Sequence, residues 1–163
     1  MGGFFGATSR KNCVLDVFFG TDYHSHLGTR RGGMAAYDPE KGFQREIHNI
    51  ENSPFRTKFQ RILEEMTGTA AIGCISDTDP QPILIRSNLG CYAICTIGLI
   101  NNAEALIKQY LTFSGGHFES MSGGKINANE LIAALIDQKS SFAEGIRFAQ
   151  EMVDGTASIL ILR

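Results

Sequence analysis

The sequence predicts an α+β fold, an αββα four-layer sandwich in which two stacked β-sheets lie between outer layers of helices. Three observations support this prediction. Strand-like and amphipathic helical segments are interspersed, several strands are joined by connections of hairpin length, and the central strands are apolar on both faces. Short connections favour antiparallel pairing, and strands that are apolar on both faces need cover on both sides. A layered sandwich satisfies both requirements.

The composition is that of one globular domain. The chain has 163 residues, of which 43% are hydrophobic and 20% charged, which is enough for one substantial core. Its 15 Lys and Arg residues against 17 Asp and Glu lack the basic excess of a nucleic-acid-binding surface. The sequence shows neither a signal-peptide pattern nor an apolar run of membrane-spanning length. We therefore expect a cytoplasmic protein without nucleic-acid or membrane partners.

The opening MGGFFG predicts a strand, because Phe4 and Phe5 need cover from water. An edge strand that begins early is the interpretation favoured by these residues alone. A terminus fixed in the fold is functional in enzymes whose first residue is a nucleophile with its own α-amine as base. Removal of Met1 would place Gly2 there, and Gly2 has no side chain.

The first half of the chain predicts helices and one hairpin. Apolar spacing predicts a helix over about 12–28, although Gly20 weakens its middle. A glycine-hinged turn then leads into a strand over 34–37, paired in a hairpin with 43–48. A helix follows from the Ser53 cap to about Gly68, with Pro54 in its first turn.

The second half alternates strands and helices, bounded by Asp, Pro, Asn and Gly residues. The expected elements are strands over 69–76, 82–87 and 90–100, a helix capped by Asn101 or Asn102, a loop over 114–125, helices over 127–138 and 140–153, and a strand over 157–162. The final run SILILR, which stops at Arg163, suggests a piece of a longer polypeptide or a strand whose partner surface lies on another domain.

The cysteines and histidines show no metal-site spacing. All four cysteines lie in apolar stretches and are predicted to be buried free thiols: Cys13, Cys74, Cys91 and Cys95. His24 and His26 are two positions apart and so lie on different faces of the predicted helix. We expect solvated or hydrogen-bonded histidines, with no metal and no cofactor.

Several short motifs occur in the order found in one enzyme family. MGGFFG resembles M-C-G-x-x-G, TRRGGMAAY resembles Q-H-R-G-Q-E-S-A-G, and GCISDTD resembles G-H-x-R-Y-x-T. Further along, CTIGLINN resembles A-H-N-G-N-L-x-N, NANE resembles S-D-x-E, and GTASILIL resembles G-x-x-S-x-x-x-L. The sequence thus resembles the class II glutamine amidotransferase domain, and in particular the amino-terminal domain of the amidophosphoribosyltransferases of purine biosynthesis.

The resemblance covers nearly all of the chain and implies a fold and a context. It implies that residues 1–163 form a sandwich of the N-terminal-nucleophile hydrolase type, with a phosphoribosyltransferase domain after residue 163. The implied partner is that domain in cis, or a second copy of the chain, and no cofactor is implied for this domain.

The resemblance also implies that the catalytic residues are lost. The family's nucleophilic cysteine falls on Gly2, its carboxylate-binding arginine on Ser76, its oxyanion asparagine on Ile97 and its amine-binding aspartate on Ala128; only Gly98 is kept. Glycine offers no thiolate, and isoleucine cannot donate a hydrogen bond to an oxyanion, a loss worth roughly 100-fold to 1,000-fold in rate. We therefore expect no glutaminase activity.

The sequence is compatible with three functions. The chain could be a degenerate domain that acts in docking or regulation within an ammonia-using phosphoribosyltransferase. It could be a stand-alone small-molecule-binding module with Arg30, Arg31 and Asp77 as polar contacts, although ion pairing is the more typical role of such arginines. It could also be an active amidohydrolase with its nucleophile relocated to Cys74 or Cys95, which is disfavoured because thiols in apolar strands are inert.

Overall fold

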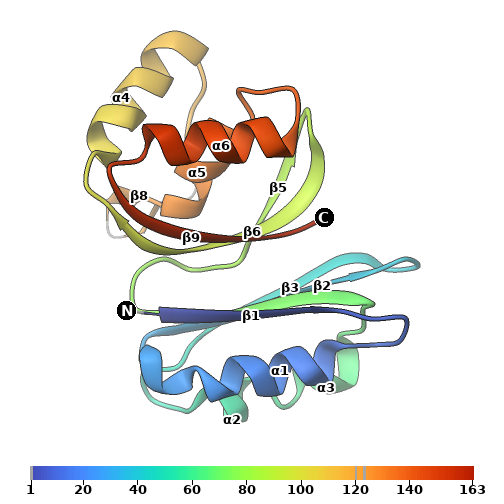
Figure 1. Cartoon of the computed structure of the whole chain (residues 1–163). Helices are drawn as coiled ribbons and strands as arrows, with labels where there is room; N and C mark the ends of the chain where they lie inside the picture. The colour runs from blue at the N-terminus through green and yellow to red at the C-terminus, as the bar shows by residue number, and fades with distance from the viewer. Residues whose placement is uncertain (1, 120, 123) are drawn as a thin grey trace.

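Two stacked sheets form the middle of the molecule, and helices cover the outer face of each (Figure 1). The computed structural model of the chain describes residues 2–119, 121–122 and 124–163. Met1, on whose removal the exposure of Gly2 depends, lies outside the described residues. The predicted αββα sandwich is confirmed.

Sheet A contains four antiparallel strands in the order β1-β4-β2-β3. These are β1 (Gly2–Thr8), β4 (Ala70–Ser76), β2 (Arg31–Asp38) and β3 (Gly42–Asn49). The predicted opening strand therefore exists and lies at an edge of its sheet. Pairing with β4 along its whole length fixes the start of the chain against the core.

Sheet B contains three antiparallel strands in the order β5-β6-β9. These are β5 (Ile83–Ser87), β6 (Gly90–Ile100) and β9 (Gly155–Leu162). A separate small hairpin joins β7 (Met121–Ser122) to β8 (Lys125–Ile126). Apart from Ile126, the residues of these two strands lie in the stretch 114–125, which the Gly and Ser content predicted to be a loop.

The helices over sheet A are shorter than predicted. They are α1 (Val14–Tyr23), the 3-10 turn Ser25–Leu27, α2 (Phe55–Phe59) and α3 (Ile62–Glu65). The prediction of one helix from Ser53 was wrong in two respects. Pro54 is the residue that precedes the helix. In addition, the amides of Leu63 and Glu64 bond three residues back instead of four, which tightens the backbone between α2 and α3.

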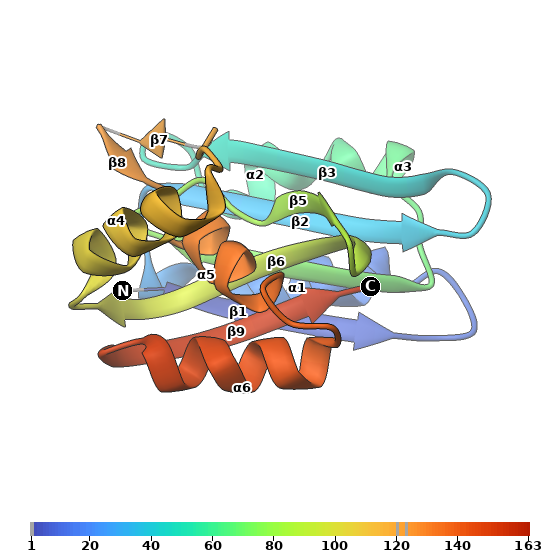
Figure 2. The same ribbon diagram turned by 90° about the horizontal axis from the view of Figure 1, so that it is seen from above.

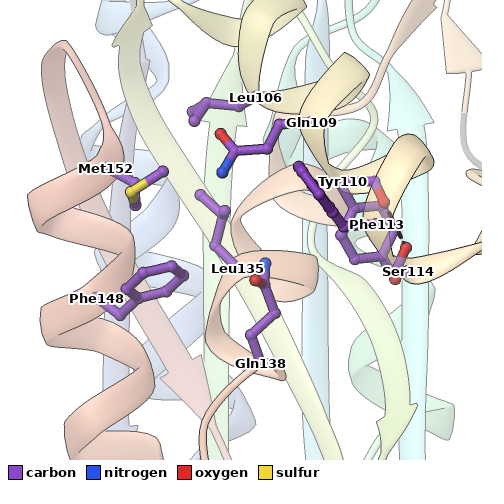
Figure 3. Close-up of a pocket in the computed structure, with 9 residues that line it drawn as sticks. All are labelled: Leu106, Gln109, Tyr110, Phe113, Ser114, Leu135, Gln138, Phe148 and Met152. Carbon is purple, nitrogen blue, oxygen red and sulfur yellow. Dashed lines mark hydrogen bonds between the residues drawn. The ribbon is translucent and has the colours of Figure 1, made fainter.

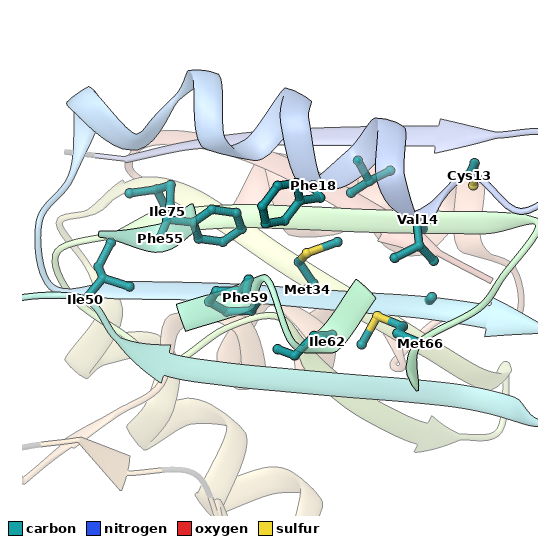
Figure 4. Close-up of a cluster of buried hydrophobic side chains, with 13 residues drawn as sticks. Cys13, Val14, Phe18, Met34, Ile50, Phe55, Phe59, Ile62, Met66 and Ile75 are labelled. Atoms are coloured by element: carbon teal, nitrogen blue, oxygen red, sulfur yellow. The ribbon is translucent and has the colours of Figure 1, made fainter. Parts of the chain in front are cut away.

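Aromatic side chains fill the layer between these helices and sheet A (Figure 4). The rings of Phe55 and Phe59 stack with their centroids 4.2 Å apart, and the Phe18 ring lies 5.7 Å from that of Phe55. Met34 and Ile75 meet them from the sheet, and all five side chains are almost completely buried. Side chains of this size each contribute about 1.5–3 kcal/mol on burial.

Three helices cover sheet B: α4 (Ala103–Ser114), α5 (Ala128–Ile136) and α6 (Phe142–Met152). Asn127 and Ser141 cap α5 and α6 by accepting hydrogen bonds from backbone amides of the first turn. Asn102 precedes α4 as predicted but makes no side-chain cap. Its side-chain amide instead donates a hydrogen bond to the Met152 carbonyl and accepts one from the Asp154 backbone N–H.

Small and sulfur-containing side chains fill the space between the sheets. Cys74 and Cys95 are fully buried there, among alanines and branched residues of both sheets. Cys13 is buried in the helix layer below sheet A. The prediction of four buried thiols was wrong for Cys91. This residue is exposed near the start of β6, next to the turn that joins β5 to β6.

The last strand is packed on both faces. Ile159 and Ile161 pack toward the helices over sheet B, whereas Leu160 and Leu162 face the space between the sheets. Ile159, Leu160 and Ile161 are half-buried in these layers, and Leu162 is buried. Among the described residues, no helix has the length and apolar character that a membrane crossing requires.

Candidate functional site

A cavity of about 420 Å³ lies between the sheets at the end where the chain begins. We call it the leading-end cavity. Its lining comes from β1, β4, β6 and β9, from the 3-10 turn after α1 and from the turn after β4. The lining residues are Gly2, Leu27, Ser76, Thr78, Thr96, Ile97, Gly98, Leu99 and Thr156.

One cross-strand row of sheet A reaches this cavity. The register pairs Gly2 with Ser76 and Ser76 with Arg31, so these positions on β1, β4 and β2 are direct neighbours. Phe4 and Cys74, two positions further along, pack between the sheets. Because side chains alternate along a strand, the row of Gly2, Ser76 and Arg31 also faces sheet B.

Ile97 of β6 fills the space next to Gly2. A Cβ atom added to Gly2 would lie 2.8 Å from Cδ1 of Ile97 and would also collide with the Ile75 carbonyl oxygen. Real Cβ atoms do not approach other heavy atoms this closely. The sequence predicted loss of the nucleophile at Gly2 and of the oxyanion donor at Ile97. The structure places these positions side by side, and Ile97 with the Ile75 carbonyl occupies the volume that a side chain at position 2 would need.

Gly98 is required by the approach of two strands. It pairs with Ala157 of β9, and a Cβ atom at this position would collide with the backbone carbonyl of Thr156. Packing alone therefore explains why glycine stands at the one family position that this chain keeps.

Ala128 lies outside the cavity lining, in the first turn of α5. Its backbone amide donates to the Asp79 carboxylate at 3.1 Å. Beside it, the buried Gln81 side chain accepts from the Thr96 amide at 2.8 Å and from the Asn129 side chain at 3.0 Å. The position expected for an amine-binding aspartate thus belongs to a structural network that joins α5 to β6.

The proposed polar contacts Arg30 and Asp77 have structural partners. Arg30 lies 3.6 Å from the Glu51 carboxylate. Asp77 accepts a hydrogen bond of 2.7 Å from the Thr29 amide, and this bond is the largest cause that lowers the pKa of the Asp77 carboxyl. Arg30, Arg31 and Asp77 are all outside the cavity lining, although Arg31 adjoins Ser76 in the sheet.

The polar groups of the cavity are hydroxyls, and most were missed at the sequence level. Ser76 Oγ lies 3.2 Å from Thr78 Oγ1 and accepts from the Thr78 amide at 3.1 Å. The spacing Ser-x-Thr at a strand end is a signal that could have predicted this turn. Leu27, Leu99 and Thr156 carried no such signal, because they reach the cavity only through tertiary packing.

The described lining contains neither an acid nor a base nor a thiol. Cys74 and Cys95 lie deeper between the sheets, and the Cys74 thiol donates to the Gln81 carbonyl at 3.2 Å. Burial raises the pKa of Cys74, so its sulfur stays protonated at neutral pH. Within the described ranges, no group of His, Cys, Asp and Glu side chains is placed to hold a metal ion.

Known structures share this fold. The chain matches glutamine phosphoribosylpyrophosphate amidotransferase from B. subtilis complexed with ADP and GMP at a TM-score of 0.81 and 25% identity, over 99% of this chain and 35% of that chain. It matches a structure described as the allosteric regulatory enzyme of purine biosynthesis at a TM-score of 0.80 and 25% identity, with the same coverage. No protein-family model matches the sequence, and no curated protein matches it.

These matches confirm the resemblance and the N-terminal-nucleophile hydrolase type of sandwich that it implied. This chain spans about a third of the length of the solved enzymes, 35% in both cases.

Proposed function

We propose that this chain is a degenerate glutaminase-like domain, a pseudoenzyme, of an amidophosphoribosyltransferase-like protein. It does not hydrolyse glutamine and acts in structure, docking or regulation. The observation that carries the proposal is the packing around Gly2, where an added Cβ atom would collide with the Ile75 carbonyl oxygen and lie 2.8 Å from Cδ1 of Ile97. Covalent amide hydrolysis requires a nucleophile, and this position supplies none.

The lining of the cavity supports the same conclusion. Free glutamine carries an α-carboxylate and an α-ammonium group at neutral pH, and buried charges need partners. The leading-end cavity offers the hydroxyls of Ser76 and Thr78 and apolar side chains such as Leu99. The cavity therefore binds glutamine poorly, and it also lacks the group that would attack the glutamine amide.

The proposed context follows from the fold. The B. subtilis structure that the chain matches is a phosphoribosylpyrophosphate amidotransferase. In a protein of that type without a working glutaminase, free ammonia or ammonia from a partner would attack phosphoribosyl pyrophosphate on a phosphoribosyltransferase domain. This domain would then contribute to assembly or control of the cytoplasmic enzyme, a glycosyltransferase.

The direct test is an assay with glutamine. We expect the protein to release neither ammonia nor glutamate above the rate without protein, under conditions in which an active phosphoribosylpyrophosphate amidotransferase turns over. Turnover that disappears in Cys74→Ala or Cys95→Ala would overturn the proposal in favour of a relocated nucleophile.

A second test restores the lost groups stepwise. Gly2→Cys alone should remain inactive after removal of Met1, because Ile97 occupies the adjacent space and donates no hydrogen bond. Gly2→Cys combined with Ile97→Asn should allow the new thiol to be alkylated faster than in the single variant. Glutaminase activity of Gly2→Cys alone would show that the cavity is still competent and that our account of Ile97 is wrong.

The alternative is a stand-alone small-molecule-binding module, which the remaining volume of about 420 Å³ favours. The two functions differ in what the gene encodes and in what the whole protein does. A reading frame that continues into a phosphoribosyltransferase-like sequence, with formation of phosphoribosylamine from ammonia, supports the first. A stop codon after Arg163 supports the second.

A further inference from the structure

A second cavity, of about 400 Å³, lies on the opposite side of sheet B from the leading-end cavity, among the three covering helices (Figure 3). We call it the helix-layer cavity. Leu106 of α4 and Leu135 of α5 are buried at its base. Phe148 and Met152 form one wall from α6, and residues of α4 face them across Leu135. The cavity is therefore enclosed by three separate elements and is not a gap within one helix.

Aromatic rings make up much of the lining. Tyr110 and Phe148 are half-buried, and Phe113 at the end of α4 is 84% exposed. Tyr110 packs against Phe118 at 5.1 Å, and the Lys139 ammonium lies 4.1 Å from the centre of the Phe148 ring. In the described part of the chain, Phe113 has no ring partner. A flat ligand in the cavity would give this ring an apolar surface to cover it.

Two side-chain amides accompany the rings. Gln109 reaches the cavity from α4 and makes no hydrogen bond within the described ranges. Gln138, just beyond α5, donates through Nε2 to the Ala134 carbonyl at 3.2 Å, which leaves its own carbonyl oxygen open. Each amide carries both donor and acceptor groups, so the pair can bond a ligand edge that offers both.

The charge of the lining restricts the ligand further. None of the described residues that line the cavity is an Asp, Glu, Lys, Arg or His residue. An ammonium group placed there would lose water without gaining a partner of opposite charge, and the ammonium beside the lining, that of Lys139, already lies over the Phe148 ring. The lining is therefore complementary to an uncharged molecule.

We propose that the helix-layer cavity is a binding site for a small, flat, uncharged aromatic molecule that carries an amide-like donor and acceptor on its edge. Sheet B separates it from the leading-end cavity, so this inference does not depend on the proposed loss of glutaminase activity. The site uses ring faces for affinity and the two glutamine amides for orientation.

Three probes of nearly equal size test the proposal on the whole protein. Benzamide is flat, uncharged and carries an amide, benzoate replaces the amide by a charge, and cyclohexanecarboxamide keeps the amide but is not flat. We expect titration followed by amide NMR shifts in α4, α5 and α6 to show benzamide binding at least about fivefold more tightly than either control. Equal binding of all three, or no shifts at these helices up to the solubility limit, would overturn the proposal.

Surface substitutions identify the site. Phe113→Ala and Gln138→Leu should each weaken benzamide binding about threefold to tenfold, as expected for one aromatic contact or one hydrogen bond. Leu111→Ala, an exposed change on the same helix but outside the lining, is the matched control and should bind like the unaltered protein. All three positions are exposed, so the fold is retained. Unchanged binding in both lining variants would place the ligand elsewhere and contradict the proposal.

Discussion

The space between the sheets is filled differently at its leading end and in its deeper part, which we call the packed end. At the packed end, Cys74 and Cys95 are almost completely buried, and Gly33 leaves no room for a Cβ atom beside the Gln81 carbonyl. At the leading end, β1, β4 and β6 line the cavity, and Leu99 is 67% exposed. The comparison indicates that the packed end holds the sandwich together, so the leading end can lose its chemistry without loss of the fold.

The largest expected difference is in thiol reactivity. In the native protein a thiol reagent should label Cys91 quickly, whereas Cys13, Cys74 and Cys95 should react at least about 1,000-fold more slowly, because they must wait for unfolding. Counting labelled thiols by mass spectrometry should give one in buffer and four in denaturant. Labelling of Cys74 or Cys95 as fast as Cys91 would show that the packed end opens freely.

Truncation at the two ends should have unequal effects on the free energy of unfolding. Ile72→Ala, at a buried position of β4 between the sheets, should cost about 3–4 kcal/mol because it leaves a cavity in a packed layer. Ile97→Ala, on β6 and already beside a cavity, should cost about 1 kcal/mol. Urea unfolding followed by circular dichroism measures both, and equal costs would contradict the difference between the ends.

Replacing a glycine by alanine is the complementary test, because it adds volume where the truncations removed it. Gly33→Ala should cost about 3 kcal/mol, because its Cβ atom would meet the backbone of Gln81, which cannot move alone. Gly2→Ala should cost less, about 2 kcal/mol, because its Cβ atom would also meet the Ile75 carbonyl oxygen, whereas the Ile97 side chain can turn into the neighbouring cavity. The same unfolding experiment applies, and a Gly2→Ala variant as unstable as Gly33→Ala would mean that the leading end is as tightly packed.

The smallest expected effect is a pH dependence of the unfolding free energy. It arises from Asp137, which lies at neither of the two compared regions, so it serves as a control. Burial raises the pKa of the Asp137 carboxyl, although the hydroxyls of Ser87 and Tyr92 donate to it. Because the folded pKa exceeds the ordinary value of 3.8, the contribution of this group to stability is complete below 3.8 and is lost as pH rises through the folded pKa. Asp137→Asn keeps the acceptor oxygen and should remove this slope from plots of unfolding free energy against pH. A slope identical in both proteins would contradict the assignment.

The sequence predicted most of the architecture because its local patterns agree with the fold. The strand over 90–100 was predicted with the bounds that β6 has, since its apolar run is delimited by glycine and asparagine. The sequence also identified Gly2, Ser76, Ile97 and Gly98 as one set, through the family resemblance, and the structure places all four in the leading-end cavity. That agreement arises because the motifs lie at the ends of strands whose pairing brings them together.

The failures concern contacts between distant segments. Cys91 has an apolar neighbourhood in sequence but lies where β5 and β6 join, so it is exposed. The assignment of Ala128 to the family's amine-binding position stays a prediction, and its backbone is held by Asp79 and the α5 cap outside the lining of the leading-end cavity. The helix-layer cavity had no sequence signal, because Phe113 and Phe148 come to line one cavity only when α4 and α6 pack on sheet B.

By itself, the sequence determined the alternation of strands and helices and the absence of a nucleophilic side chain at position 2, because periodicity and residue identity are local properties. Only the tertiary structure decided that Ile97 fills the space beside Gly2, that the thiols between the sheets are sealed, and that two cavities lie on opposite sides of sheet B. These features depend on how closely separate strands and helices approach one another. That approach is set by the sum of many side-chain volumes and by no single motif.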